Sequence, residues 1–92
     1  MQIDIPKEAI TKYLERRRSD INNCRQALES GNLKVCETVG HQLKGNGSMF
    51  GFPEISDIGK SLEDAAKEHN NEAAIHCVDE LESIVNKSLL HH

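Results

Sequence analysis

Aromatic side chains are scarce in this 92-residue chain, which has no tryptophan, one tyrosine and two phenylalanines. With so few large aromatic side chains, we expect a core of aliphatic residues packed between helices rather than a β-sandwich. The chain is also short, near the lower end of what buries a stable core. The length therefore predicts a single domain over residues 1–92.

Long hydrophobic runs and an excess of basic charge are lacking as well. No apolar stretch approaches the roughly 20 residues needed to span a bilayer, and the N-terminus has no charged-then-apolar signal pattern. A net charge of -4 argues against a nucleic-acid partner, since binding to phosphates requires a basic face. We therefore predict a soluble, cytoplasmic protein that meets other proteins rather than membranes or nucleic acids.

Three cysteines are an odd number, and Cys24, Cys36 and Cys77 are widely spaced at apolar helical positions. This pattern predicts that the cysteines are small buried residues of the core in a reducing compartment and that they form no disulfides. A metal site formed by His69, His76 and Cys77 is an alternative. Because His76 and Cys77 are adjacent on a predicted helix, their side chains diverge, and we predict no metal site.

Apolar residues recur at steps of three and four along four stretches, which predicts four amphipathic helices. The predicted helices cover Pro6 to Ser30, Leu33 to Phe50, Pro53 to the turn at His69, and about Glu72 to Leu89. Short turns join them and no strand signal separates them. The pattern predicts an all-α fold, an antiparallel up-down four-helix bundle.

The two ends of the chain have separate interpretations. The segment from Met1 to Ile5 is too short to form a sheet. We predict that it is a short N-terminal arm, with Ile3 and Ile5 packing over the end of the bundle. His91 and His92 could be the remnant of an affinity tag, so no function is assigned to them.

The second predicted helix carries a histidine in unusual surroundings. Measured from the centre of its apolar face, His41 lies roughly 140° away and is predicted to point to solvent. Lys44 and Gly45 follow one turn later on the same side. The buried face is predicted to hold Leu33, Cys36, Val39, Gly40, Leu43, Gly47 and Phe50.

Glycines interrupt this helix at a cost of about 1 kcal/mol each relative to alanine. Gly40 and Gly47 lie on the predicted buried face, where a missing side chain lets another helix approach closely. Gly45 instead lies on the side of His41 and removes a side chain one turn from the imidazole. We interpret Gly45 as giving a partner access to His41.

The segment His41-x-Leu43-Lys44-Gly45, followed after five residues by Gly51, resembles the signature of the histidine phosphotransfer (HPt) domain of multistep phosphorelays. The likeness extends to Leu62-Glu63 and covers most of the chain in helix order and length. The chain departs from the usual pattern just before the histidine, where alanine is common and Gly40 stands instead. That change reduces helix stability but leaves the chemistry untouched.

The resemblance implies that His41 accepts a phosphoryl group from a receiver-domain aspartyl phosphate and passes it to another receiver domain. An exposed imidazole is largely neutral at pH 7, so a ring nitrogen has a free lone pair. Lys44 would stabilise the transferring phosphoryl oxygens. The resemblance also implies that Glu63, on the next helix, holds the other ring nitrogen. The alternatives are an ordinary surface histidine and a solvated glutamate.

Docking of the receiver is predicted on the surface beside the histidine. Gly45 and Ser48 would leave a shallow surface there, and Met49 would supply an adaptable apolar contact, although it could equally lie at the edge of the core. The implied partners are response-regulator receiver domains, a hybrid sensor histidine kinase, or both, and the chain is expected to act as a monomer. It needs no cofactor of its own, because Mg²⁺ would belong to the receiver.

Arg16-Arg17-Arg18 is a compact cluster of positive charge in the first predicted helix. We interpret it as a solvated cluster, with a docking patch for an acidic partner as the alternative. Arg17 lies on the apolar seam, where its stem can cover apolar surface while its head reaches water.

Competing functions remain open. No glycine-rich loop follows a strand, so no ATP site and no kinase activity are expected, and whether the chain acts as an enzyme at all stays open. The dimerisation and phosphoacceptor domain of a sensor kinase usually has an acidic residue directly after the histidine, where Gln42 stands here. The alternative from another class is a helical adaptor or inhibitor that binds a signalling partner without phosphoryl transfer.

Overall fold

The computed structural model describes residues 4–91, which fold into four α-helices and one short 3-10 helix. No strand occurs within these residues. The elements are α1 (Lys7–Ser30), α2 (Leu33–Asn46), η1 (Ser48–Phe50), α3 (Pro53–Lys67) and α4 (Asn71–Leu90). Ile5, in the predicted arm, is half-buried, whereas Ile3 lies outside the described residues.

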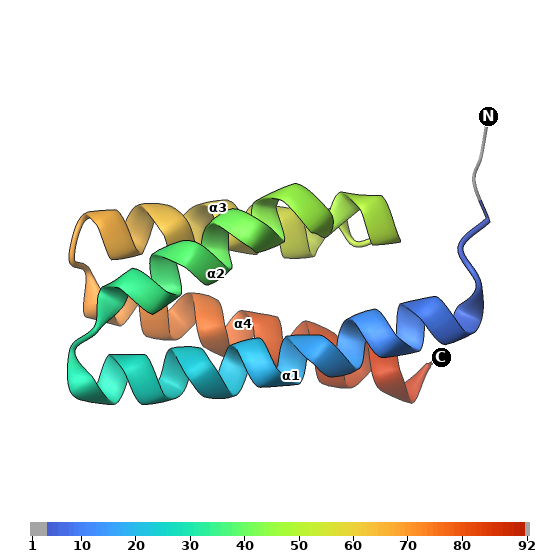
Figure 1. Cartoon of the computed structure of the whole chain (residues 1–92), viewed down its shortest axis with the longest axis horizontal. Helices are drawn as coiled ribbons and strands as arrows, with labels where there is room; N and C mark the ends of the chain where they lie inside the picture. The colour runs from blue at the N-terminus through green and yellow to red at the C-terminus, as the bar shows by residue number, and fades with distance from the viewer. Residues whose placement is uncertain (1–3, 92) are drawn as a thin grey trace.

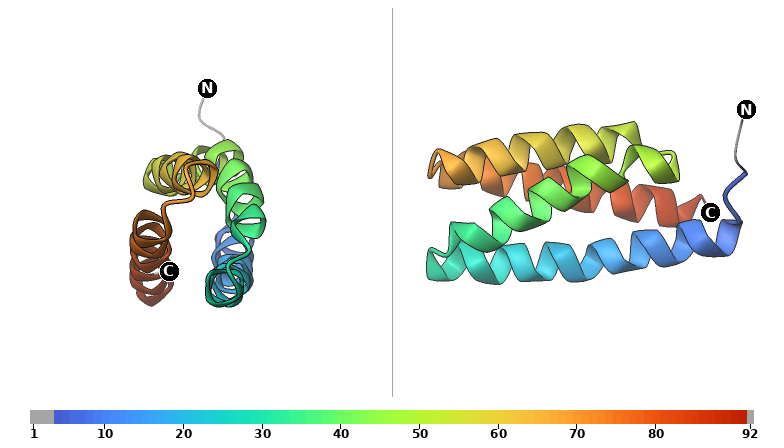
Figure 2. Two further views of the ribbon diagram at one scale, coloured as in Figure 1. Left: turned by 90° about the vertical axis from the view of Figure 1, so that its left-hand side faces the viewer. Right: turned by 45° about the horizontal axis from the view of Figure 1, so that its top comes forward.

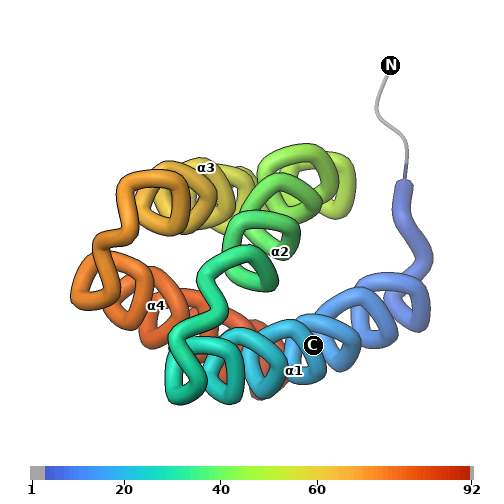
Figure 3. The backbone as a smooth tube through the Cα atoms, turned by 60° about the vertical axis from the view of Figure 1, so that its left-hand side comes forward, coloured from blue at the N-terminus to red at the C-terminus, as the bar shows by residue number. Residues whose placement is uncertain are grey.

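Consecutive helices run in opposite directions, and each packs against its neighbours in the chain (Figure 1). Seen end on, the four helices occupy the corners of a bundle, with α4 returning to lie beside α1 (left view of Figure 2). The tube in Figure 3 follows the same path from α1 through α2 and α3 to α4. The predicted all-α, antiparallel four-helix bundle is confirmed.

Turn-forming residues set most helix ends where the sequence predicts them. Gly31 ends α1 in the left-handed conformation, with φ 74°, and Pro53 is the first residue of α3. The side chain of Asn70 accepts a hydrogen bond of 3.1 Å from the backbone N–H of Ala73, which caps the N-terminus of α4. Local sequence chemistry therefore sets these three helix ends.

The second predicted helix is shorter than expected. A continuous helix from Leu33 to Phe50 is wrong, since α2 ends at Asn46 and the separate turn η1 follows Gly47. Gly51 closes that turn with φ 85°, and the N–H of Phe52 bonds back to the carbonyl of Gly47 at 2.9 Å. The low helix propensity of the glycines here lets the chain turn towards α3.

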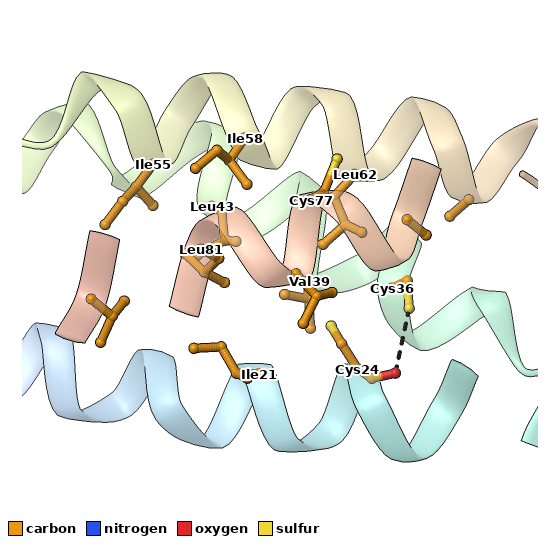
Figure 4. Close-up of a cluster of buried hydrophobic side chains, with 14 of the residues drawn as sticks. Ile21, Cys24, Cys36, Val39, Leu43, Ile55, Ile58, Leu62, Cys77 and Leu81 are labelled. Atoms are coloured by element: carbon orange, nitrogen blue, oxygen red, sulfur yellow. Dashed lines mark hydrogen bonds between the residues drawn. The ribbon is translucent and has the colours of Figure 1, made fainter. Parts of the chain in front are cut away.

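Aliphatic side chains from all four helices fill the core, as Figure 4 shows for part of it. The three cysteines are free and buried among them, as the sequence predicts. The thiol of Cys36 donates a weak hydrogen bond of 3.9 Å to the backbone carbonyl of Cys24 (Figure 4). The cysteines act here as small packing residues between α1, α2 and α4.

Two features are absent from residues 4–91. None of the helices there is long and apolar enough to cross a membrane. No group of three or more His, Cys, Asp or Glu side chains in that range is arranged to hold a metal ion.

Candidate functional site

Helices α2 and α3 approach so closely at one crossing that only glycine fits on either side. A Cβ atom on Gly40 would lie 2.5 Å from the backbone nitrogen of Glu63 and 2.7 Å from the carbonyl oxygen of Gly59. A Cβ on Gly59 would lie 2.5 Å from the backbone nitrogen of Lys44. The close approach predicted for Gly40 is confirmed, and the crossing places the backbone of α3 directly beside the segment that carries the histidine.

His41 lies on the outer side of this crossing, where its side chain is 69% exposed, so the predicted exposure is confirmed. Its Nδ1 lies 3.0 Å from Oε2 of Glu63 on α3. The side chain of Glu63 is only 7% exposed, which makes Glu63 the one charged residue among the buried side chains of residues 4–91. A covered carboxylate therefore holds the inner nitrogen of a ring that otherwise faces solvent.

Two lysines surround the same carboxylate. Lys44 Nζ, one turn after His41, donates a hydrogen bond of 2.9 Å to Oε1 of Glu63. Lys67 Nζ, on α3, lies 3.6 Å from Oε2. Sequence reasoning missed Lys67, although its spacing of four residues from Glu63 on one helix was the available signal. The site therefore contains one histidine, one carboxylate and two ammonium groups.

The charge state of Glu63 determines which nitrogen of the His41 ring carries the hydrogen. The hydrogen bond from Lys44 lowers the pKa of Glu63 to about 2, helped by the bond to His41 and the charges of both lysines and opposed by desolvation. Glu63 is therefore an anion at neutral pH and can only accept hydrogen bonds. His41 must then carry a hydrogen on Nδ1, which leaves the lone pair of a neutral ring on Nε2. No residue within 4–91 forms a hydrogen bond with Nε2.

The predicted docking residues lie at the end of α2 and on η1. A Cβ on Gly45 would meet no atom within 4 Å, so the surface beside His41 is open at this point. Met49 is 72% exposed, which argues against its being a residue at the edge of the core. The backbone N–H of Ser48 donates a hydrogen bond of 2.8 Å to the hydroxyl of Ser56, which anchors η1 to α3. Docking itself stays a prediction for these three residues.

His76 on α4 also lies beside a carboxylate and can be compared with His41 on α2. His76 Nε2 lies 3.1 Å from Oε1 of Glu80, but both side chains are more than half exposed, at 76% and 51%. The carboxylate of that pair is a solvated surface group, whereas Glu63 is covered. Burial of the carboxylate therefore distinguishes the His41 site from an ordinary surface pair.

Comparison with known proteins identifies one family. The sequence model described as the Hpt domain matches residues 8–89, which include all four helices except the ends of α1 and α4. A search of the curated proteins and a search of the solved structures each found no match. Since the family match covers nearly the whole described bundle and the His41 site within it, the chain belongs to the Hpt domain family.

Proposed function

We propose that His41 accepts a phosphoryl group from the aspartyl phosphate of one receiver domain and passes it to the aspartate of another. Membership of the Hpt domain family supports a phosphotransfer role in phosphorelays. The observation that carries the proposal is the exposed imidazole of His41, whose Nδ1 is held 3.0 Å from a buried, ionised carboxylate. The free nitrogen Nε2 is then the nucleophile.

The transfer can be written with its bonds balanced. The lone pair on Nε2 of His41 attacks phosphorus, the N–P bond forms, and the P–O bond to the donor aspartate breaks and releases a carboxylate. The ring keeps its hydrogen on Nδ1 and gains a positive charge, which the anion of Glu63 stabilises. In the second step the carboxylate of another receiver attacks phosphorus, and the N–P bond breaks to restore the neutral imidazole.

Lys44 supports the same reaction from the neighbouring turn of α2. Its ammonium group has three donors, of which Glu63 takes one. With its side chain 43% exposed, Lys44 can direct another donor at an oxygen of a phosphoryl group bound to His41. Glu63 thus positions the ring and the lysine together, through its two oxygen atoms.

The partners belong to the same proposal. Hpt domains interact with receiver domains and kinases in phosphorelays. We propose that this chain acts as a monomer with response-regulator receivers, a hybrid sensor histidine kinase, or both, and that Mg²⁺ is bound by the receiver. The cytoplasmic location predicted from the sequence remains part of the proposal.

A label-transfer experiment tests the function. The chain is incubated with ³²P-phosphorylated receiver domains from its own organism, and radioactivity on the chain is followed over seconds to minutes. We expect label on the wild type and on His76→Gln, and none on His41→Gln. His76→Gln is a matched control because it removes the other histidine paired with a carboxylate. Circular dichroism should show the same helix content in all three proteins.

Two results would overturn the proposal. Label that persists in His41→Gln would place the phosphoacceptor elsewhere. A receiver that binds the wild-type chain and never labels it would favour the helical adaptor that takes no phosphoryl group.

A further inference from the structure

The three consecutive arginines of α1 have three different surroundings. The guanidinium of Arg17 lies 4.3 Å above the ring of Tyr13, and its side chain is 12% exposed, so most of this arginine is covered. Arg18 reaches Oδ1 of Asn86 on α4 at 3.4 Å. Arg16 is exposed and has no partner within residues 4–91. The cluster is therefore not one uniform solvated patch.

Arg16 and Arg17 line a pocket of about 350 Å³ in the corner between α1 and the end of α2. Lys12 adds a third cation to its wall, and none of the lining residues within 4–91 is acidic. Phe50 of η1 and Asn46 of α2 form the opposite side. We call this hollow the basic pocket.

Aromatic contacts hold the basic pocket in a defined shape. Tyr13 stacks on Phe50 with the ring centroids 4.3 Å apart and the planes at 12°. The hydroxyl of Tyr13 donates a hydrogen bond of 2.6 Å to Oδ1 of Asn46. These contacts fix the end of α2 and η1 against α1, so the pocket forms without a ligand. They also connect it directly to the segment that carries Gly45 and Met49.

The charge of the basic pocket is opposite to that of the chain, whose net charge is -4. Glu8 lies four residues before Lys12, and Asp20 lies four residues after Arg16, a spacing at which ion pairs can form along a helix. Neither ion pair forms. Asp20 lies 3.1 Å from Nε of Arg17 instead. Two exposed cations therefore border an aromatic surface without an acidic partner among residues 4–91.

We infer that the basic pocket receives an acidic side chain of the receiver domain while that domain docks over His41. The inference rests on the proposed function, because it names a second contact of the same partner. Asn46 follows His41 by five residues, so the pocket begins about 7.5 Å further along the axis of α2 and about 140° around it. A standard interface covers about 800 Å² on each partner, a patch roughly 30 Å across, so a receiver that docks across the exposed side of α2 can contact both places.

The chemistry of the pocket specifies its occupant. A carboxylate can take two parallel hydrogen bonds from the guanidinium of Arg16 and a further one from Lys12. The carbon atoms that carry it would lie against the ring of Phe50, where apolar contact is favourable. An acidic segment with an apolar or aromatic neighbour fits both features.

The test compares two charge reversals on one helix. The receiver that labels the chain is titrated, without phosphorylation, against wild type, Arg16→Glu and Arg18→Glu. We expect the Kd to rise about tenfold or more for Arg16→Glu and to stay within about twofold for Arg18→Glu, since close charge pairs act locally. Lys12→Glu should repeat the Arg16 result, which guards against a folding defect of one variant. Wild-type affinity should fall with added NaCl more steeply than that of Arg16→Glu.

The outcomes separate this inference from the proposed function. Equal Kd changes for Arg16→Glu and Arg18→Glu, or none, would overturn the docking contact while labelling of His41 continues. Transfer to Arg16→Glu at saturating receiver should stay within about twofold of wild type, because the variant changes binding rather than chemistry. Competition by inorganic phosphate at constant ionic strength would show a free-anion site and would also overturn the inference.

Discussion

Nδ1 of His41 lies 3.0 Å from Oε2 of Glu63, although the two residues are 22 positions apart in the chain and lie on different helices. The contact is possible because the backbones of α2 and α3 meet at Gly40 and Gly59. The geometry of the proposed reaction therefore depends on the packing of two helices as much as on the reacting groups.

Replacing Gly40 with alanine should disrupt this crossing. The new methyl group would lie 2.5 Å from the backbone of Glu63, which cannot move as a side chain can. We expect the free energy of unfolding to fall by about 1–3 kcal/mol, as for other overpacked positions. Urea denaturation followed by circular dichroism measures the change.

Gly45→Ala is the control for that experiment, since a Cβ there meets no atom within 4 Å. Replacing a helical glycine in open space should raise the free energy of unfolding by up to about 1 kcal/mol. Equal destabilisation by the two substitutions would contradict the close-crossing account of Gly40.

The stability of the chain should depend on pH through Glu63. Its pKa is about 2 in the folded chain, compared with an ordinary value of 4.5, so the unfolded chain binds this proton first as pH falls. The stabilisation from the ionised carboxylate is fully present above pH 4.5 and is lost as pH falls towards 2. The difference in urea midpoint between wild type and Glu63→Gln should therefore be constant near neutral pH and change across that window. A difference that stays constant down to pH 2 would refute the assigned ion pairs.

The two lysines at Glu63 should contribute unequally. Lys44 Nζ is 2.9 Å from Oε1, whereas Lys67 Nζ is 3.6 Å from Oε2, and the hydrogen bond from Lys44 is the largest cause of the lowered pKa. NMR titration of the Glu63 carboxyl carbon should show its pKa rise further in Lys44→Ala than in Lys67→Ala. Lys44→Ala should also slow phosphoryl transfer without a loss of helix content. The reverse order of the two pKa changes would make Lys67 the principal partner.

Gly45→Glu should separate docking from folding. The exposed position leaves room for a long side chain in the isolated chain, so we expect the free energy of unfolding to change by less than about 1 kcal/mol. On the docking surface, the same side chain would meet the receiver and should reduce the transfer rate at low receiver concentration. An unchanged rate would remove the access role assigned to Gly45.

Local patterns in the sequence predicted much of this molecule. The apolar spacing along the chain places the four helices, and the same spacing puts His41 outside and Gly40 inside, because both follow from the turn of a single helix. The end of α2 could not be located from the apolar spacing. Gly47 keeps helical dihedrals, φ -56° and ψ -52°, and it is the hydrogen bonding around it that changes to that of a turn.

Relations between helices were harder to predict from the sequence. The pairing of Glu63 with His41 came only from the family resemblance, since helical periodicity does not indicate which neighbour a side chain meets on another helix. The burial of Glu63, the participation of Lys67 and the stacking of Arg17 on Tyr13 depend on the same three-dimensional packing. They therefore required the structure.

The crossing of α2 and α3 also bears on how this chain can vary. The position of His41, the proposed phosphoacceptor, depends on two residues that carry no side chain, Gly40 and Gly59. In a library of all single substitutions screened for folding stability, Gly40 and Gly59 should tolerate replacement poorly, whereas the exposed residues of η1 should tolerate it well. Natural variants could then exchange partners by changing that surface and leave the relation between ring and carboxylate intact.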